Sequence, residues 1–148
     1  MIKVEDIVYA RFRAPDLDKM EAFLVDFGME RYARTDTALY MGGVGPDPIV
    51  HVTELGDAGF VGLALQASSE ADLISVAEAS GASVEARTEP GGGQRVLIHD
   101  PDGFPIEIVH GLEHLDVAEV QEKAPLNARL DKPRLGDVKR MAAGPAHV

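Results

Sequence analysis

Apolar and polar residues alternate over several short stretches, and between these stretches apolar residues recur at helical spacing. Alternation over residues 7–13 predicts a strand with one apolar face. Asp16 or Asp18 is the expected N-cap of a helix that ends at Gly28. The expected apolar stripe of this helix is Met20, Phe23, Leu24 and Phe27. Three short strands are expected next, near residues 30–34, 37–41 and 49–54.

The same order of elements then repeats. A strand is expected over residues 60–67, and Ser69 is the expected N-cap of a helix that ends at Gly81. Asp16 and Ser69 are 53 positions apart, as are Gly28 and Gly81. Three further strands are expected near residues 82–87, 95–98 and 104–110. The chain therefore reads as two copies of a βαβββ unit.

Two such units predict an α+β fold. We expect tandem βαβββ modules over residues 1–56 and 57–111 to form a curved, mostly antiparallel eight-stranded cup, with the helices on its convex side. From residue 112 onward the chain is polar and interrupted by prolines. Residues 112–148 are expected to form a tail or linker, with a short helix up to residue 122 and an extended arm after it.

Composition narrows the classes of partner and location. The formal net charge of −11 disfavours nucleic acid and anionic membranes as partners, because both bind basic surfaces. No apolar run is long enough to cross a bilayer, and the N-terminus lacks the apolar core of a signal peptide. The cysteine count is zero. A cytoplasmic location is the expectation.

The most informative stretch is the turn and strand from Asp100 to Gly111. Asp-Pro-Asp-Gly predicts a tight turn, because Pro101 fixes an early turn position and Gly103 accepts a positive φ. In the strand that follows, Glu107 is a lone carboxylate among apolar residues. A buried carboxylate needs a metal ion, a hydrogen-bond donor or water. Glu107 is therefore the first candidate site residue.

This turn and strand resemble the last strand of the vicinal oxygen chelate superfamily, which includes glyoxalase I, bleomycin-resistance proteins and extradiol dioxygenases. The resemblance implies that Glu107 occupies a metal-ligand position. It also implies ligands, usually histidines, at the first-strand position of Tyr9 and at the fifth-strand position near Gly62. Neither is a histidine here. Two histidines and one carboxylate are the usual Fe(II) set, so the chain departs from the family at its metal positions.

His51 is the remaining candidate for a metal ligand beside Glu107. Matching the two modules by sequence places Val50 opposite Glu107, and alternation then turns His51 toward the other sheet face. Strand parity and the family register together place Tyr9, Arg11, Gly62, Ala64 and Gln66 on the concave surface with Glu107. We expect Arg11 or Tyr9 to donate a hydrogen bond to Glu107 in place of a metal.

The whole chain is most similar to the N-terminal domain of two-domain extradiol dioxygenases that act on catechols or dihydroxybiphenyls. The similarity rests on residues 14–18, 23–28, 51–54, 100–111 and 132–146. It implies an oxidoreductase of aromatic catabolism whose N-terminal domain lacks the metal, with Fe(II) or Mn(II) held by a C-terminal catalytic domain. No cofactor is then expected in this chain.

Two functional alternatives stay open. In the first, the chain is the non-catalytic half of such an enzyme, and its partner is the missing catalytic domain or a second copy of the chain. In the second, it is a free-standing protein of the superfamily that binds a small hydrophobic or aromatic ligand, or acts as a metal-dependent lyase or isomerase whose metal ligands come from more than one subunit. The sequence leaves undecided whether the chain is itself an enzyme.

Overall fold

The computed structural model describes residues 3–43 and 47–115, which contain two helices and eight strands. The tail expected over residues 112–148 lies outside the described residues from position 116 onward. In chain order the elements are β1 (Val4–Ala14), α1 (Leu17–Asp26), β2 (Glu30–Arg34), β3 (Ala38–Gly42), β4 (His51–Leu55), β5 (Gly59–Ala67), α2 (Glu70–Ser80), β6 (Val84–Ala86), β7 (Gln94–His99) and β8 (Pro105–His110).

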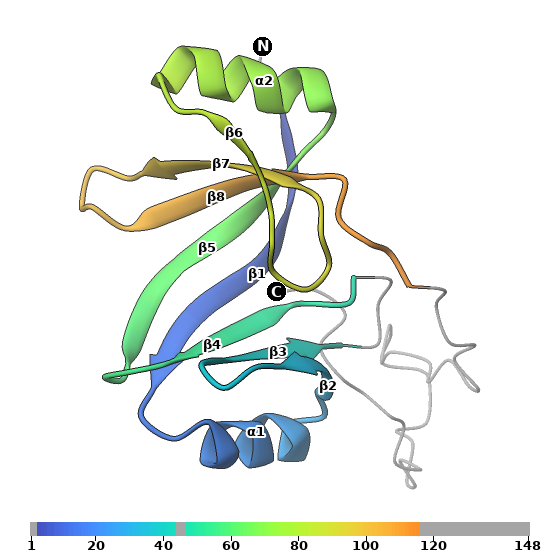
Figure 1. Ribbon diagram of the computed structural model, residues 1–148, viewed down its shortest axis with the longest axis vertical. Helices are drawn as coiled ribbons and strands as arrows, with labels where there is room; N and C mark the ends of the chain where they lie inside the picture. The colour runs from blue at the N-terminus through green and yellow to red at the C-terminus, as the bar shows by residue number, and fades with distance from the viewer. Residues whose placement is uncertain (1–2, 44–46, 116–148) are drawn as a thin grey trace, which may run out of the picture.

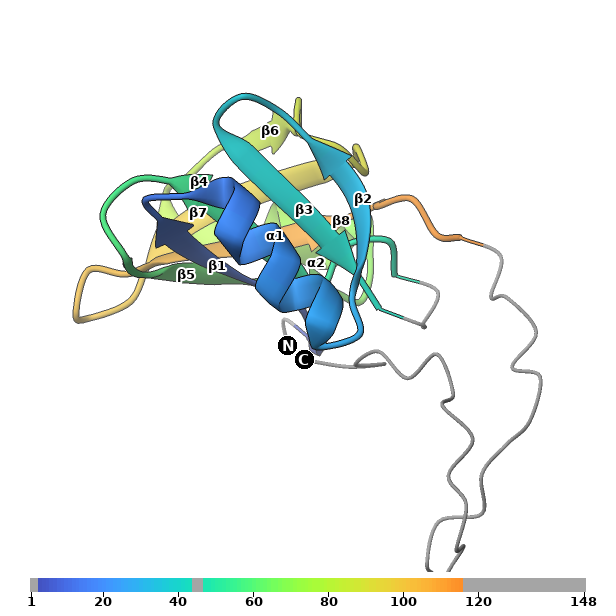
Figure 2. The ribbon, with the colours of Figure 1, turned by 90° about the horizontal axis from the view of Figure 1, so that it is seen from below.

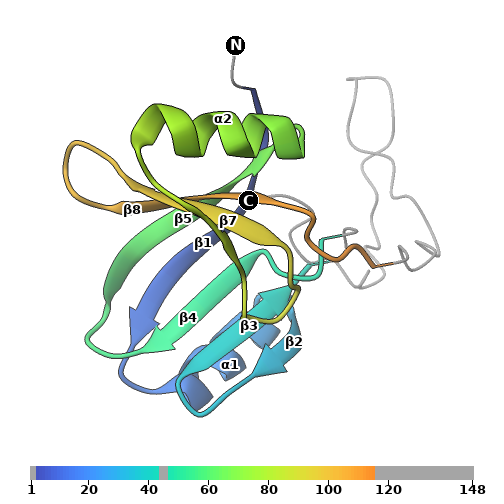
Figure 3. The same ribbon diagram turned by 45° about the horizontal axis from the view of Figure 1, so that its top comes forward.

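The strands form a single curved sheet in the order β2-β3-β4-β1-β5-β8-β7-β6 (Figure 1). The pairs β1–β4 and β5–β8 are parallel, and the remaining pairs are antiparallel. Each βαβββ module supplies one half of the sheet, and the first strands of the two modules, β1 and β5, lie side by side at its centre (Figure 3). The predicted α+β architecture and mostly antiparallel sheet are confirmed.

Helix α1 begins at Leu17 because Asp16 caps it. The Asp16 carboxylate accepts hydrogen bonds from the backbone N–H groups of Asp18 and Lys19, both at 3.0 Å. The chain leaves the helix through Gly28, whose φ of +98° favours glycine. Of the two N-caps considered from the sequence, Asp16 is the one used.

The expected apolar stripe of α1 is partly wrong. Leu17 and Leu24 are buried, and Met20 packs with them against the sheet. Phe23 and Phe27 are 62% and 64% exposed and stack on one another, with ring centroids 6.2 Å apart. Residues four positions apart on a helix are neighbours, so the two phenylalanines form a separate exposed row instead of joining the core.

Helix α2 matches the prediction at both ends. The Ser69 hydroxyl accepts a hydrogen bond from the backbone N–H of Asp72 at 3.1 Å, and Gly81 ends the helix in the left-handed conformation. Its buried face is Leu73, Val76 and Ala77, which pack on side chains of β5, β7 and β8.

Both helices lie on the outer, convex side of the curved sheet, one over each module (Figure 1), and Figure 2 shows α1 in front of the strands. Alternation explains this. In β8, Ile106 and Ile108 pack under α2, so Glu107 and Val109 face the concave side. No helix among residues 3–43 and 47–115 is long and apolar enough to span a bilayer.

Candidate functional site

Glu107 lies at the centre of the concave face. Its neighbour across the parallel pair β5–β8 is Ala64, which in turn lies opposite Tyr9 of β1. Only 5% of Glu107 is exposed, so its carboxylate needs compensation from the protein.

Both oxygens of the Glu107 carboxylate have donors. Oε1 accepts a hydrogen bond from Nε of Arg11 at 3.1 Å and lies 2.9 Å from Nη2 of the same guanidinium. Oε2 accepts from the Tyr9 hydroxyl at 3.1 Å and from Arg95 at 3.3 Å. The Arg11 contact is a charge-assisted hydrogen bond to one carboxylate oxygen. These donors supply the compensation that a metal ion would otherwise give.

Arg11 holds two further carboxylates. Its Nη1 lies 2.9 Å from Glu54 Oε1, and its Nη2 lies 2.8 Å from Glu89 Oε2. The guanidinium therefore pairs with three glutamates, while only 7% of the residue is exposed. Arginine suits this position because its planar fork offers five N–H donors in a fixed arrangement.

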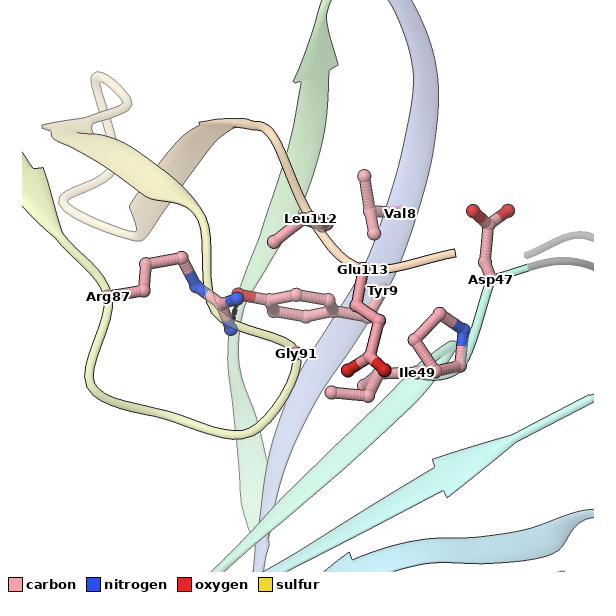
Figure 4. Close-up of a pocket in the computed structure, with 9 residues that line it drawn as sticks. Val8, Tyr9, Asp47, Ile49, Arg87, Gly91, Leu112 and Glu113 are labelled. Carbon is pink, nitrogen blue, oxygen red and sulfur yellow. Dashed lines mark hydrogen bonds between the residues drawn. The ribbon is translucent and has the colours of Figure 1, made fainter. Parts of the chain in front are cut away.

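The loop between β6 and β7 adds a third arginine from above the sheet. Arg87 reaches over the Tyr9 ring, with its guanidinium at the hydroxyl end of the ring (Figure 4), and Nη2 donates to that hydroxyl at 3.3 Å. Nη1 of Arg87 donates to the Gly92 carbonyl at 2.6 Å, which fixes the loop. Glu89, on the same loop, pairs with both Arg87 and Arg11.

We call this group the concave ion cluster. Its charged members balance, with three arginines facing three glutamates, and Tyr9 joins them as a neutral donor. Its residues are Tyr9, Arg11, Glu54, Arg87, Glu89, Arg95 and Glu107.

Three members of the cluster, Tyr9, Arg11 and Glu89, have shifted pKa values. Burial, reinforced by Glu107, raises the pKa of Tyr9 to about 12, so the phenol stays protonated. Burial alone would lower the pKa of Arg11, but Glu107 and Glu89 raise it above its ordinary value. Burial alone would raise the pKa of Glu89, but the hydrogen bond and charge of Arg11 lower it. These three groups therefore keep one charge state near neutral pH, which does not suit general acid–base catalysis.

The structure brings together three of the residues singled out from the sequence, Tyr9, Arg11 and Glu107. Both donors expected for Glu107 contact it. Gly62 lies opposite Arg11 across β1–β5, where an added side chain would collide with the Pro105 carbonyl. Gln66 lies two positions beyond Ala64 on β5, and its amide donates to the Ala67 carbonyl at 3.3 Å, outside the cluster.

His51 lies on the other face of the sheet. Its ring stacks on Phe12 with centroids 5.0 Å apart, and Nε2 lies 2.8 Å from the Thr53 hydroxyl. Burial lowers its pKa, so the ring is neutral at pH 7. The observed register makes Val52 the counterpart of Glu107, because Arg11 pairs with Val52 as Ala64 pairs with Glu107. The sequence matching, which chose Val50, was two residues off, but the parity is the same.

Sequence reasoning missed four members of the cluster. Arg95 follows from alternation in β7, where it lies opposite Val109 on the concave face. In β4, alternation likewise places Glu54 on the same face as Val52, which pairs with Arg11. Arg87 and Glu89 lie in a glycine-rich loop without periodicity, so no pattern in the sequence places them near Glu107.

These residues do not fit a divalent metal ion. Glu107 already binds Tyr9 and two arginines, and arginine repels cations and offers them no lone pair. Within the part of the chain that the structure describes, no group of three or more His, Cys, Asp or Glu side chains could hold a metal ion. A resident metal centre at Glu107 would require the cluster to come apart.

Comparison with solved structures identifies the fold. The chain resembles the Mn(II)-bound glyoxalase from Novosphingobium aromaticivorans with a TM-score of 0.72 and 23% identity, covering 82% of this chain and 44% of that one. It resembles homoprotocatechuate 2,3-dioxygenase from Brevibacterium fuscum, in complex with 3,4-dihydroxyphenylacetate, with a TM-score of 0.66 and 22% identity, covering 78% and 39%. It resembles homoprotocatechuate 2,3-dioxygenase from Arthrobacter globiformis with a TM-score of 0.63 and 25% identity, covering 78% of this chain and 38% of that one.

The chain has the vicinal oxygen chelate fold. It spans less than half the length of the solved structures that it resembles. No protein-family model and no curated protein sequence matches it. The vicinal oxygen chelate fold hosts more than one chemistry, so the fold alone does not assign a function, and the concave ion cluster has to be considered with it.

Proposed function

We propose that this chain is the non-metal, N-terminal half of an aromatic ring-cleaving extradiol dioxygenase. In this role it supplies one copy of the cup, and a C-terminal domain of the same fold binds Fe(II) or Mn(II) and cleaves a catechol-type substrate. The observation that carries the proposal is the saturation of Glu107 by Tyr9, Arg11 and Arg95 at the position where the superfamily resemblance implies a metal ligand.

The lengths of the structural neighbours support this proposal. The two homoprotocatechuate 2,3-dioxygenases are more than twice as long as the part that this chain matches. A chain of this size would then supply one half of such an enzyme. The arginine–glutamate cluster gives that half a rigid centre without a catalytic role.

The second candidate is a free-standing superfamily protein that binds a small ligand, or a metal-dependent lyase or isomerase. The observation that favours it is the TM-score of 0.72 to the Mn(II)-bound glyoxalase. If that enzyme class were correct, Glu107 would have to exchange its arginine partners for a metal ion and find nitrogen donors that its concave neighbours, Gly62 and Ala64, do not offer.

The coding sequence beyond Val148 tests the proposal directly. We expect the reading frame to continue into a second pair of βαβββ modules with histidines on its first and fifth strands and a glutamate on its last. A stop codon directly after Val148 would contradict the proposal, as would ring cleavage of a catechol by the isolated 148-residue chain with Fe(II).

A further inference from the structure

A second feature of the concave face is a cavity beside the ion cluster. It has a volume of about 290 Å³, opens to solvent, and lies between β1, β3, β4 and the β6–β7 loop. Arg11, Glu54 and Glu89 border it on the cluster side, and Tyr40, Ala38 and Leu55 border it on the other. The void beside Tyr9 and Arg87 in Figure 4 is far smaller, about 10 Å³, and holds no more than a water molecule.

The charged lining of this cavity is acidic, with two carboxylates and one guanidinium. All three nitrogens of that guanidinium already bind glutamates. By contrast, Oε1 of Glu89 accepts no hydrogen bond within the described part of the chain, and Nη1 of Arg95 lies 3.8 Å from it. Oε2 of Glu54 pairs with the exposed Arg13, at 3.5 Å. The cavity wall therefore offers two carboxylate oxygens, Glu89 Oε1 and Glu54 Oε2, that can accept hydrogen bonds from a ligand, and few free donors.

Tyr40 supplies an independent observation. Its side chain lines the cavity and only 4% of the residue is exposed, yet its hydroxyl has no hydrogen-bond partner among residues 3–43 and 47–115. The hydroxyl oxygen itself is not fully buried, so it is accessible from the open cavity. Burial raises the pKa of Tyr40, so the hydroxyl remains a neutral group able to accept from a ligand.

We propose that this cavity binds a small protonated amine. The ammonium group would donate to Glu54, Glu89 and the Tyr40 hydroxyl, and an aromatic or alkyl tail would lie against Ala38, Leu55 and the Tyr40 ring. The net charge of −11 raises the concentration of cations near the surface. This site does not depend on the proposed function, because it requires neither a metal nor a second domain.

Titration of the full chain, followed by ¹H–¹⁵N NMR, tests the amine site with three probes of one shape. These are 2-phenylethylammonium, neutral 2-phenylethanol and anionic phenylacetate. We expect the ammonium alone to shift amide signals of β3, β4 and the β6–β7 loop, with a dissociation constant of about 1 mM that rises with added salt. Equal shifts with the alcohol or the anion, or shifts spread over the whole surface, would overturn the proposal.

Two variants with matched controls locate the site. Tyr40→Phe removes the hydroxyl and should weaken ammonium binding about fivefold, and Glu54→Gln about tenfold. Tyr32→Phe and Glu30→Gln, on the edge strand β2, should leave it unchanged. Unchanged binding in both cavity variants would contradict the proposal. If Tyr40→Phe perturbs the whole spectrum, Glu54→Gln and the three probes decide.

Discussion

The guanidinium of Arg11 contacts one carboxylate oxygen of Glu107, with Nε at 3.1 Å and Nη2 at 2.9 Å. The two residues are 96 positions apart in the chain. This contact joins the first strand of one module to the last strand of the other. It places a fixed positive charge where the superfamily resemblance implies a metal ion. The stability of the cup should therefore depend on this contact, and so should the proposed inability of Glu107 to bind a metal ion.

Replacing Arg11 by methionine should strongly destabilise the protein. The substitution keeps much of the side-chain volume but leaves Glu107 without its main partner and Glu54 and Glu89 with fewer donors. Removing one partner of a buried ion pair costs about 3–5 kcal/mol, which urea denaturation monitored by circular dichroism would measure.

Arg13→Met is the matched control for that experiment. Arg13 lies on the same strand and also pairs with Glu54, but its side chain is 53% exposed and the distance is 3.5 Å. We expect its free energy of unfolding to change by less than about 1 kcal/mol. Equal losses in Arg11→Met and Arg13→Met would show that the concave ion cluster contributes no special stability.

Tyr9 should make the protein sensitive to alkali. Its pKa in the folded state is about 12 against an ordinary 10.0, so the folded protein holds this proton more tightly than the unfolded chain. The resulting stability is complete below pH 10 and is lost as the pH rises to about 12, by roughly 3 kcal/mol. Denaturation at pH 9, 10 and 11 would measure the slope.

The variant Tyr9→Phe isolates this contribution. It should be less stable than the wild type at pH 9 by about 1–2 kcal/mol, because Glu107 and Arg87 lose a hydrogen-bond partner. The difference should shrink as the pH rises above 10. A difference that stays constant with pH would mean that the Tyr9 phenol titrates alike in the folded and unfolded states.

Glu89 should contribute stability that acid removes. Its pKa in the folded state lies below its ordinary value of 4.5, so its contribution is present above that pH and is lost as the pH falls through the lowered pKa. Glu89→Gln should therefore be less stable than the wild type at pH 7, and the gap should close in acid. Glu78→Gln, on the exposed face of α2, should stay within about 0.5 kcal/mol at pH 7.

Much of the scaffold followed from the sequence because local signals agreed with one another. Ser69 and Gly81 delimit α2 as their cap preferences predict, and the two modules that the repeat predicts occupy equivalent halves of the sheet. Strand parity, together with the register that the family resemblance implies, placed Tyr9, Arg11 and Glu107 on one face. Phe23 was misplaced, because helical spacing alone does not tell which of two adjacent apolar rows meets the sheet.

The rest of the candidate site depends on contacts that periodicity does not encode. Arg87 and Glu89 reach the cluster only because the β6–β7 loop folds over the cup and is fixed by the bond from Arg87 to the Gly92 carbonyl. The unpartnered hydroxyl of Tyr40 depends on the three-dimensional packing around it. Features of this kind appear only once distant segments meet.

Manganese binding tests the central claim most directly. The electron paramagnetic resonance signal of free Mn(II) should keep its full amplitude when one equivalent of the full chain is added near pH 7. The reason is that Tyr9, Arg11 and Arg95 already bind the Glu107 carboxylate. Glu107→Gln should behave like the wild type. A stoichiometric loss of the free signal that Glu107→Gln abolishes would show that Glu107 binds a metal ion, and would contradict the proposal that this chain is the half without a metal.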